Sequence, residues 1–540
     1  MKKADIILKS SCIYTCTDLD VFAGFVAVKG NRILAVGSDN IAGYIDENTE
    51  VIELGDKLIL PGFIDAHDHF FDGAVTSSEH MCDITSSKSE EEAVEMLKEY
   101  ASSHPDEKRI RAMGWFPANW NDAPLPTRKS LDKEFPKIPV YCIAADFHTI
   151  WLNEKDLEES GYTAEYIPPS GEIGKFEDGT LNGLLFEPDA FQMAMEKIMD
   201  FTIEEEKENL KAFLAHIAKA GITAVSDMSA GDYSFGNQNN LIAAKELSET
   251  GELTARIHVY SKLIGYEDFT DTIRCAEKYN DDRLKINGVK GFIDGVTSTF
   301  TGLLLEPYTD RPDTTGIGVP VVSHDDLKKY VIAANKAGLP VRLHCIAEGA
   351  VRMALDIYEE SLKVTGHKLN NTIEHIETID EQDIPRFKEL NVIPSMQPQH
   401  LTLDFNEKIR RLGEKRCRWE WPHRSLLDAG AVLAFGTDYP VVDFNPYPSL
   451  YTAVTRLDME GNPTGINPEE KITLKEAIYA YTAGSAAAYG RLDELGTLEE
   501  GKLADIVVAD RNLFIVPEAE IKDAQTAMTV MDGKIVYSSI

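Results

Sequence analysis

The sequence is short of positive charge and lacks long apolar runs. Its 540 residues include 54 lysines and arginines against 90 aspartates and glutamates, a net charge of −36. Nucleic acids and anionic membranes attract proteins through basic side chains, so this balance disfavours both as partners. No stretch is apolar for long enough to cross a membrane or to act as a secretory signal. We therefore expect a cytoplasmic protein that binds neither nucleic acids nor membranes.

Cysteine is scarce as well. The seven cysteines are an odd and scattered set, and no pair has the spacing of a zinc knuckle. Reduced thiols are the natural interpretation, so disulfides do not hold this fold together. A hydrophobic content of 43% can instead supply a sizeable core. The length fits a large barrel together with a second module.

Both ends of the chain have the pattern of β-structure. Alternating residues with hairpin turns occur at Gly30-Asn31 near the start and at Asp532-Gly533 near the end. Because chain termini often lie close together, we expect residues 1–58 and 495–540 to form one small β-sandwich module.

The middle of the chain repeats a helix that ends at Ala-Gly and a short apolar strand that follows. The repeat occurs at residues 220–221, 337–338 and 429–430. Glycine there supplies a left-handed helix end, and such apolar strands are buried on both faces. Eight strand candidates alternate with helices, which predicts an α/β fold: a (β/α)₈ TIM barrel over residues 59–494. The long stretch 71–200 after the first strand is expected to form a lid or pocket wall.

Two histidines lie two residues apart in the first predicted barrel strand. Side chains alternate across a strand, so His67 and His69 point to the same face, and Asp65 shares it. Alone, the pair fits a metal site and a pair of buried, hydrogen-bonded histidines equally well. However, His344, His375 and Asp438 end three further strands, and barrel enzymes build their sites at these ends. Together they predict a divalent metal site, and imidazole nitrogens suit zinc.

Lys290 lies inside the predicted fourth strand. A buried lysine is costly unless it is paired or chemically altered. It can pair with Asp294, which shares its strand face. As a neutral amine it can instead add carbon dioxide and become a carbamate that bridges two metals. The spacing of these residues leaves both readings open.

These residues suggest hydrolysis of a carbon–nitrogen bond next to a carbonyl. A metal activates water, and Asp438 passes the proton of that water to the leaving amine. The alternatives are an aminohydrolase (deaminase) and an ester or lactone hydrolase. A non-catalytic metal-dependent binding or regulatory protein is a further alternative. The presence of Asp438 favours an enzyme, because a binding module needs no proton shuttle.

The motifs together resemble the amidohydrolase superfamily, and within it amidohydrolase family 3, the branch that contains N-substituted formamide deformylases. They are LPGFIDAHDHF, VKGFIDG, TIEHIE, SMQPQH and GTDYPV. The resemblance implies a homodimer and a carboxylated Lys290 that bridges two metals. The ligands that it implies are His67, His69, Lys290, His344, His375 and Asp438. It also implies that His400 and His148 lie in the pocket near the substrate. We further predict His375 and His400 as catalytic groups beside Asp438, and Gln397 as a substrate contact.

The chain departs from the family pattern after its strand-five histidine. The family continues there with Ile-Gly-Asp-Arg, whereas this chain has Ile346-Ala347-Glu348-Gly349. A substrate contact at this position is therefore not carried over. The deaminase branch has a glutamate three residues after that histidine, whereas Glu348 is four residues after His344. This spacing disfavours deamination.

Large aromatic residues are concentrated outside the predicted strands. Trp115 and Trp151 lie in the 71–200 stretch. An aromatic pocket wall would favour a substrate with an apolar or aromatic N-substituent, and the alternative is that these rings pack the stretch itself. Arg456 and Asp294 are further candidates for substrate contacts.

Overall fold

The computed structural model describes residues 2–540 except 18–19, 39, 116–119, 121–123, 146–148, 169–170, 187, 199, 229–237, 264–268, 313–322 and 404. The chain divides into two compact units. One unit consists of Met1–Phe71 and Leu214–Ile540, and the other consists of Asp72–Phe213.

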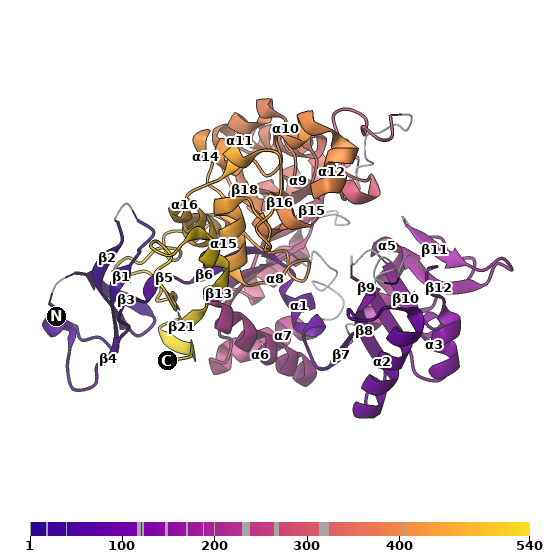
Figure 1. Cartoon of the computed structure of the whole chain (residues 1–540), viewed down its shortest axis with the longest axis horizontal. Helices are drawn as coiled ribbons and strands as arrows, with labels where there is room; N and C mark the ends of the chain where they lie inside the picture. Colours follow the sequence, from indigo (N-terminus) through magenta and orange to yellow (C-terminus); the bar gives the residue numbers. More distant parts are fainter. Residues whose placement is uncertain are drawn as a thin grey trace. The chain divides into compact units, whose positions relative to one another are not determined.

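The first unit contains a nearly closed parallel barrel (Figure 1). Among the described residues its eight strands follow one another in chain order around the barrel. They are β6 (Phe63–Asp68), β13 (Ile222–Asp227), β14 (Arg256–Lys262), β15 (Leu284–Phe292), β16 (Val341–Cys345), β17 (Thr372–His375), β18 (Ile393–Met396) and β19 (Ala434–Phe435). The Asp438 amide donates to the His67 carbonyl at 2.6 Å, and the His69 amide donates to the Tyr439 carbonyl at 3.0 Å. These bonds join the chain after β19 to β6, and the TIM-barrel prediction is confirmed.

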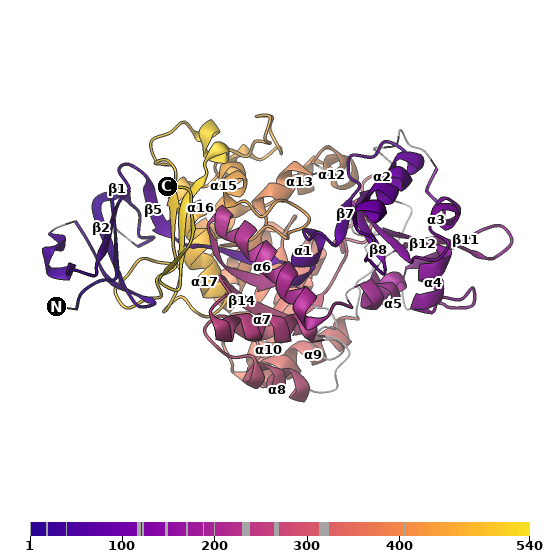
Figure 2. The same ribbon diagram turned by 90° about the horizontal axis from the view of Figure 1, so that it is seen from below.

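Helices surround the barrel strands, so the strands are buried on both faces (Figure 2). They include α7 (Asn239–Thr250), α8 (Thr270–Lys278), α9 (His324–Lys336), α10 (Glu348–Thr365), α11 (Ile384–Leu390), α14 (His423–Asp428), α15 (Pro446–Thr455) and α16 (Leu474–Tyr479). The glycine of each predicted Ala-Gly helix end has a positive φ: 88° at Gly221, 82° at Gly338 and 84° at Gly430. Glycine is needed there because a side chain disfavours this conformation.

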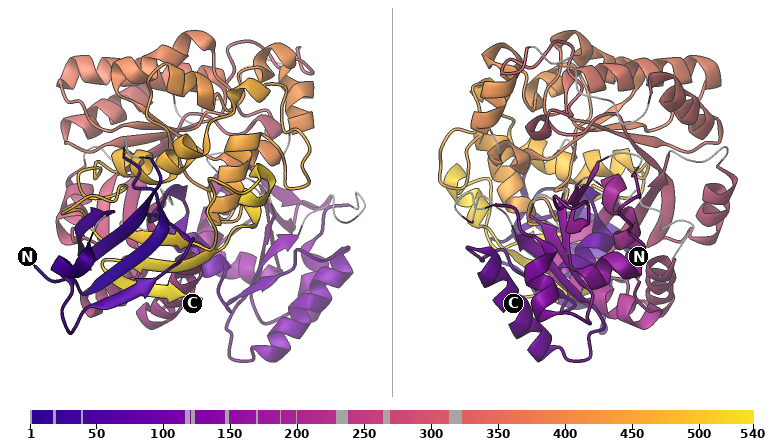
Figure 3. Two further views of the ribbon diagram at one scale, coloured as in Figure 1. Left: turned by 60° about the vertical axis from the view of Figure 1, so that its left-hand side comes forward. Right: turned by 90° about the vertical axis from the view of Figure 1, so that its right-hand side faces the viewer.

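Strands from both chain ends form one sheet (Figure 3). The sheet order is β22-β21-β20-β5-β1-β2-β3, with β4 paired to β1, within the described residues. The strands are β1 (Ile6–Ile13), β2 (Phe22–Lys29), β3 (Arg32–Gly37), β4 (Glu50–Glu53), β5 (Leu58–Pro61), β20 (Ile506–Ala509), β21 (Thr526–Met531) and β22 (Lys534–Ser538). The antiparallel pair of β5 and β20 joins the two ends of the chain. The two ends therefore share a sheet, and its description as a sandwich stays a prediction.

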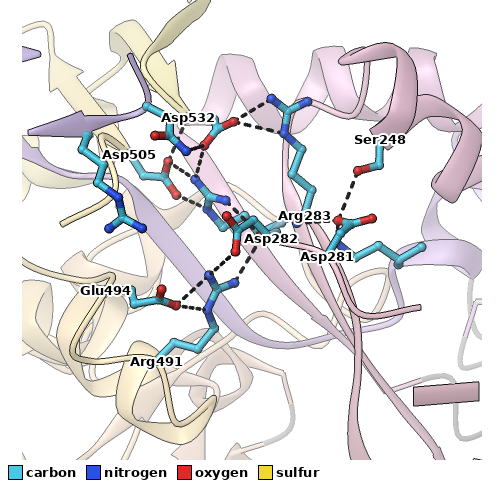
Figure 4. A network of polar contacts seen from close by, with 12 residues as sticks. Ser248, Asp281, Asp282, Arg283, Arg491, Glu494, Asp505 and Asp532 are labelled. Carbon is cyan, nitrogen blue, oxygen red and sulfur yellow. Dashed lines mark hydrogen bonds and ion pairs between the residues drawn. The ribbon is translucent and has the colours of Figure 1, made fainter. Parts of the chain in front are cut away.

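A buried ion-pair network connects this terminal sheet to the barrel (Figure 4). Arg256 of β14 is fully buried, and it donates to the two carboxylate oxygens of Asp505 at 2.7 and 2.9 Å. Arg256 also donates to Asp532 at 3.0 Å, and Arg283 donates to Asp532 at 2.6 Å. The network thus holds the starts of two barrel strands to the turns of the terminal sheet.

The second unit has a sheet of its own, with the order β11-β12-β10-β9-β8-β7 in the residues that the structure describes. Its strands are β7 (Met81–Asp83), β8 (Ile110–Trp115), β9 (Val140–Ala144), β10 (Thr149–Leu152), β11 (Glu172–Lys175) and β12 (Leu181–Phe186), and its helices include α2 (Glu90–Ser103), α3 (Arg128–Glu134), α4 (Glu154–Ser160) and α5 (Pro188–Ile198). The 71–200 stretch is therefore a folded unit rather than an extended loop. Its role as a lid or pocket wall and the predicted domain boundaries stay predictions.

None of the helices in the described part of the chain is long and apolar enough to span a membrane. The cytoplasmic location stays a prediction from the sequence.

Candidate active site

Histidines from distant parts of the sequence converge at the C-terminal ends of the barrel strands. His375, the last residue of β17, lies at the centre of the group. Its ring centroid is 4.4 Å from that of His344 in β16, 4.7 Å from that of His67 in β6 and 6.3 Å from that of His400. The His67 and His69 rings are 6.0 Å apart. The structure therefore brings together the histidines that the sequence analysis selected in separate strands.

Asp438 lies among these rings. Its Oδ1 is 3.3 Å from His67 Nε2 and 3.2 Å from His69 Nε2. Its Oδ2 is 4.0 Å from His375 Nδ1 and 4.0 Å from His400 Nε2. Asp438 thus belongs to two groups, one with His67 and His69 and the other with His375 and His400. Within each group, one nitrogen or oxygen atom of every residue lies within 4.8 Å of those of the other two. This spacing is suitable for metal binding.

Close packing of the first and last barrel strands positions Asp438. A Cβ on Gly436 would lie 2.4 Å from the His67 amide nitrogen, so only glycine permits this approach. Asp65 accepts hydrogen bonds from the Thr437 hydroxyl at 2.6 Å, from the Thr437 amide at 3.0 Å and from the His67 amide at 3.1 Å. Asp65 thus fastens the two strands together beside the cluster.

The backbone at the site is strained. Asp438 has φ 60° and His375 has φ 74°, a region that residues with a side chain occupy at a cost. Such conformations persist where the surrounding structure determines them and are concentrated at functional sites.

A hydrogen bond to one nitrogen of each ring orients the imidazoles of His67, His344 and His375. Nδ1 of His67 lies 2.6 Å from Oε2 of Glu374, and Nδ1 of His375 lies 2.8 Å from Oε1 of Gln397. Nε2 of His344 lies 3.3 Å from the Gly295 carbonyl oxygen. Each acceptor favours an N–H on the ring nitrogen that it contacts and leaves the other nitrogen with a free lone pair.

Burial favours the neutral forms of His344, His375 and Lys290. It lowers the pKa of His344 to about 3, with the positive charge of Lys290 adding to the effect, and it also lowers the pKa of His375. Burial lowers the pKa of Lys290 to about 8, although the carboxylates of Glu374 and Asp438 act in the opposite direction. Neutral imidazole is the form that binds metal, so this donor set suits a divalent cation.

Lys290 and Asp294 do not form the pair that the sequence analysis considered. Among the described residues, the structure records no ion pair or hydrogen bond for the Lys290 amine, which lies 5.2 Å from the Phe292 ring centroid. The Asp294 carboxylate instead accepts the amides of Leu303, Ile346 and Ala347 at 3.0, 2.9 and 3.1 Å. Asp294 therefore fixes the backbone that directly follows β16 and holds the segment at Leu303 beside it.

The sequence profile described as the amidohydrolase family matches residues 50–537. The chain belongs to this family.

Similar proteins match almost the whole chain. Protein LONG AFTER FAR-RED 3 from Arabidopsis thaliana is 29% identical over 99% of this chain and 92% of its own length. The N-substituted formamide deformylase of Arthrobacter pascens is 26% identical over 99% of this chain and 98% of its own length. An uncharacterized metal-dependent hydrolase from Pyrococcus horikoshii OT3 is 26% identical, with a TM-score of 0.79 over 95% of this chain and 99% of that chain.

Family membership and the donor set agree on the chemistry. The chain is a metal-dependent hydrolase that acts on carbon–nitrogen bonds. Its barrel ends carry imidazole and carboxylate groups in a buried cluster, the ligand types that bind divalent metals in such enzymes.

Arg456, a predicted substrate contact, lies in a buried structural position. Its guanidinium donates to the carbonyls of Trp421 and Glu420 at 3.1 and 3.2 Å and to the Asn467 side chain at 2.6 Å. It thereby holds the segment after β18. A role for Arg456 in substrate binding stays a prediction.

The aromatic candidates of the second unit lie in its core. Trp115 and Trp151 are 1% and 0% exposed, and the Trp115 indole donates to the Cys142 carbonyl at 2.9 Å. This packing is the alternative that the sequence analysis left open, and substrate contact by either ring stays a prediction. His148 lies outside the described residues.

The glutamate that replaces the family aspartate after β16 makes internal contacts. Glu348 begins α10, accepts from the Thr378 hydroxyl at 3.2 Å and lies 3.8 Å from the Arg416 guanidinium. These contacts give Glu348 a structural role at the start of the helix.

The sequence analysis missed two buried charges of opposite sign. Glu374 precedes His375 in TIEHIE, and Arg342 lies two residues before His344 in PVRLHC. Both are fully buried, and their nearest atoms are 3.4 Å apart. The signal was a charged residue inside each of two apolar strands, because such residues are almost never fully buried unless they are paired.

Proposed function

We propose that the chain hydrolyses a small amide, with an N-substituted formamide or a cyclic amide as the substrate class. The convergence on Asp438 is the observation that carries this proposal. His67 and His69 lie within 3.3 Å of one carboxylate oxygen, and His375 and His400 lie 4.0 Å from the other. A carboxylate in this position can exchange protons with a substrate bound at the strand ends.

The proposed metal ligands are His67, His69, Lys290, His344, His375 and Asp438. Nitrogen and carboxylate donors favour zinc, and we propose two zinc ions per chain. When bound, the metal polarises the substrate carbonyl and lowers the pKa of water.

The protein's own groups handle the protons. Asp438 accepts a proton from the attacking water and delivers it to the leaving nitrogen, which then departs as an amine. His400, whose Nε2 lies 3.3 Å from the Thr437 carbonyl, and His375 lie beside that carboxylate. We assign His400 to the developing charge on the carbonyl oxygen, where hydrogen-bond donors are most effective, whereas His375 acts as a metal ligand. Gln397 orients His375 through its 2.8 Å contact.

Lys290 is proposed to carry a carboxylate that bridges the metals. A pKa of about 8 leaves a fraction of the amine neutral near neutral pH, and the described residues offer it no ion pair. The neutral nitrogen attacks carbon dioxide, an N–C bond forms and one proton leaves. Elemental analysis should find two metals per chain when bicarbonate is present and fewer in Lys290→Ala. A single metal that does not respond to bicarbonate would count against the bridge.

The deciding experiment is a screen of metal-loaded protein against N-substituted formamides, acyl amines and cyclic amides. We expect release of a primary amine with its carboxylic acid, or ring opening of a cyclic amide. The activity should disappear after treatment with a chelator and return with zinc. Release of ammonia from ring amines would identify a deaminase, and release of acid from esters or lactones alone would identify an esterase. Either result would overturn the proposed amide substrate.

A further inference from the structure

A buried carboxylate outside the proposed ligand set contacts one of its histidines. Glu374 lies in β17 and is 0% exposed. Its Oε2 accepts from His67 Nδ1 at 2.6 Å. Its Oε1 accepts from the Thr372 hydroxyl and from Arg342 Nη1, the latter at 3.4 Å. Both carboxylate oxygens are therefore used, one toward the site and one toward the barrel interior.

Arg342 is itself held in place. It lies in β16 and donates to the Ala66 carbonyl of β6 at 2.8 Å and to the Tyr260 hydroxyl of β14 at 3.2 Å. Its guanidinium carbon lies 4.2 Å from the Tyr260 ring centroid. The arginine thus contacts three barrel strands besides its own, so the carboxylate beside it has little freedom to move.

Glu374 remains ionised although it is buried. The Arg342 guanidinium lies 3.4 Å from Glu374 Oε1, and this fixed positive charge favours the ionised carboxylate. A full negative charge therefore faces the outer nitrogen of the His67 ring. Such a carboxylate fixes the tautomer of an imidazole and increases the basicity of its other nitrogen.

We propose that Glu374, anchored by Arg342, is a positioning residue that holds the His67 ring with its Nε2 lone pair facing the space beside Asp438 where a metal would bind, and that it thereby sets the affinity of the site for its metal. The proposal rests on the proposed function, in which His67 is a ligand. The arrangement leaves His67 Nε2 3.3 Å from Asp438 Oδ1.

The substitution Glu374→Gln tests the charge while it preserves the shape. A glutamine oxygen can still accept from His67, but the negative charge is lost. Changes to groups that orient metal ligands weaken metal binding by roughly 10–100-fold. We expect zinc affinity, measured by competition with a chromogenic chelator, to fall about 10-fold in Glu374→Gln and nearer 100-fold in Glu374→Ala. The visible spectrum of the cobalt-substituted protein should change in both variants.

The matched control is Glu470→Gln. Glu470 is also buried and accepts the Ser425 amide at 2.9 Å, but it contacts none of the proposed ligands. Its zinc affinity and cobalt spectrum should match those of the wild type. If Glu374→Gln fails to fold because Arg342 lacks a counter-charge, the double variant Arg342→Met/Glu374→Gln removes both charges. The same loss of zinc affinity is expected there.

The two proposals fail in different ways. If the wild type binds zinc and hydrolyses amides while the folded Glu374 variants keep wild-type zinc affinity and an unchanged cobalt spectrum, the positioning role is wrong and the proposed function stands. If the wild type shows no metal-dependent amide hydrolysis but zinc binding still depends on Glu374, the proposed function is wrong and Glu374 positions a ligand for another activity.

Discussion

The two ends of the barrel strands bury charged side chains in different ways. At the N-terminal ends, the fully buried Arg256 meets two carboxylates, Asp505 and Asp532, that come from the terminal sheet. At the C-terminal ends, imidazoles gather around the carboxylate of Asp438, and the amine of Lys290 lies in the same interior. The first group balances its charge within the chain, whereas the second offers lone pairs to a cation. This difference distinguishes a structural cluster from a site for chemistry.

The largest effect is expected on the catalytic rate, from a substitution at the C-terminal ends of the barrel strands. Asp438→Asn keeps the shape but removes the proton acceptor, and general acid–base groups contribute roughly 10²–10⁴-fold to rate. We expect kcat to fall by about that factor in protein that is saturated with zinc, where the loss of one ligand charge does not limit the metal content. Steady-state kinetics with elemental analysis measure both, and Asp428→Asn at the surface is the control. Full activity in Asp438→Asn would remove Asp438 from the mechanism.

A substitution at the N-terminal ends of the barrel strands should cause a large loss of stability with little direct effect on catalysis. Arg256→Met leaves Asp505 and Asp532 without their shared cation, and breaking a buried ion pair costs about 3–5 kcal/mol. Urea unfolding should show a loss of that size, and the double variant Arg256→Met/Asp505→Asn should recover part of it. The same change at the exposed Arg274 is the control. Equal losses at both arginines would contradict the assigned role of the network.

The contribution of Arg283 to the free energy of unfolding should depend on pH. Burial raises the pKa of Asp532, but the hydrogen bond and charge of Arg283, together with Arg256, outweigh it and lower the pKa below its usual value. This contribution is therefore present above pH 4 and is lost as the pH falls through the lowered pKa. Arg283→Met should cost about 1.5–3 kcal/mol at pH 7, and the difference from wild type should shrink toward pH 3. A difference that does not vary with pH would show that Arg283 acts through packing.

The smallest effect is expected at an exposed pair of the terminal sheet. Lys9 contacts Glu53 at the surface, where water screens the charges. Lys9→Ala should change the free energy of unfolding by less than about 1 kcal/mol. Thermal and urea unfolding test this, and a loss as large as that of Arg256→Met would contradict the contrast between buried and exposed pairs.

The sequence alone predicted the features that depend on local pattern. Period-two alternation placed His67 and His69 on one face, and the Ala-Gly helix ends with their apolar strands indicated the barrel. The rule that barrel sites form at the C-terminal ends of strands then grouped His344, His375 and Asp438. Each of these inferences uses only a few neighbouring residues and the geometry that a strand or helix imposes on them.

Tertiary structure alone decided which distant side chains meet. Nothing in the local pattern indicated that Arg342 and Glu374 are partners beneath His67, or that Asp294 accepts three amides instead of pairing with Lys290. The pattern also left open whether Trp115 and Trp151 line a pocket or pack within the 71–200 stretch, and the fold of that stretch buries both. The physical reason is that burial and pairing depend on contacts between residues far apart in the chain. Residue type and spacing state which groups need a partner, but the packed fold selects the partner.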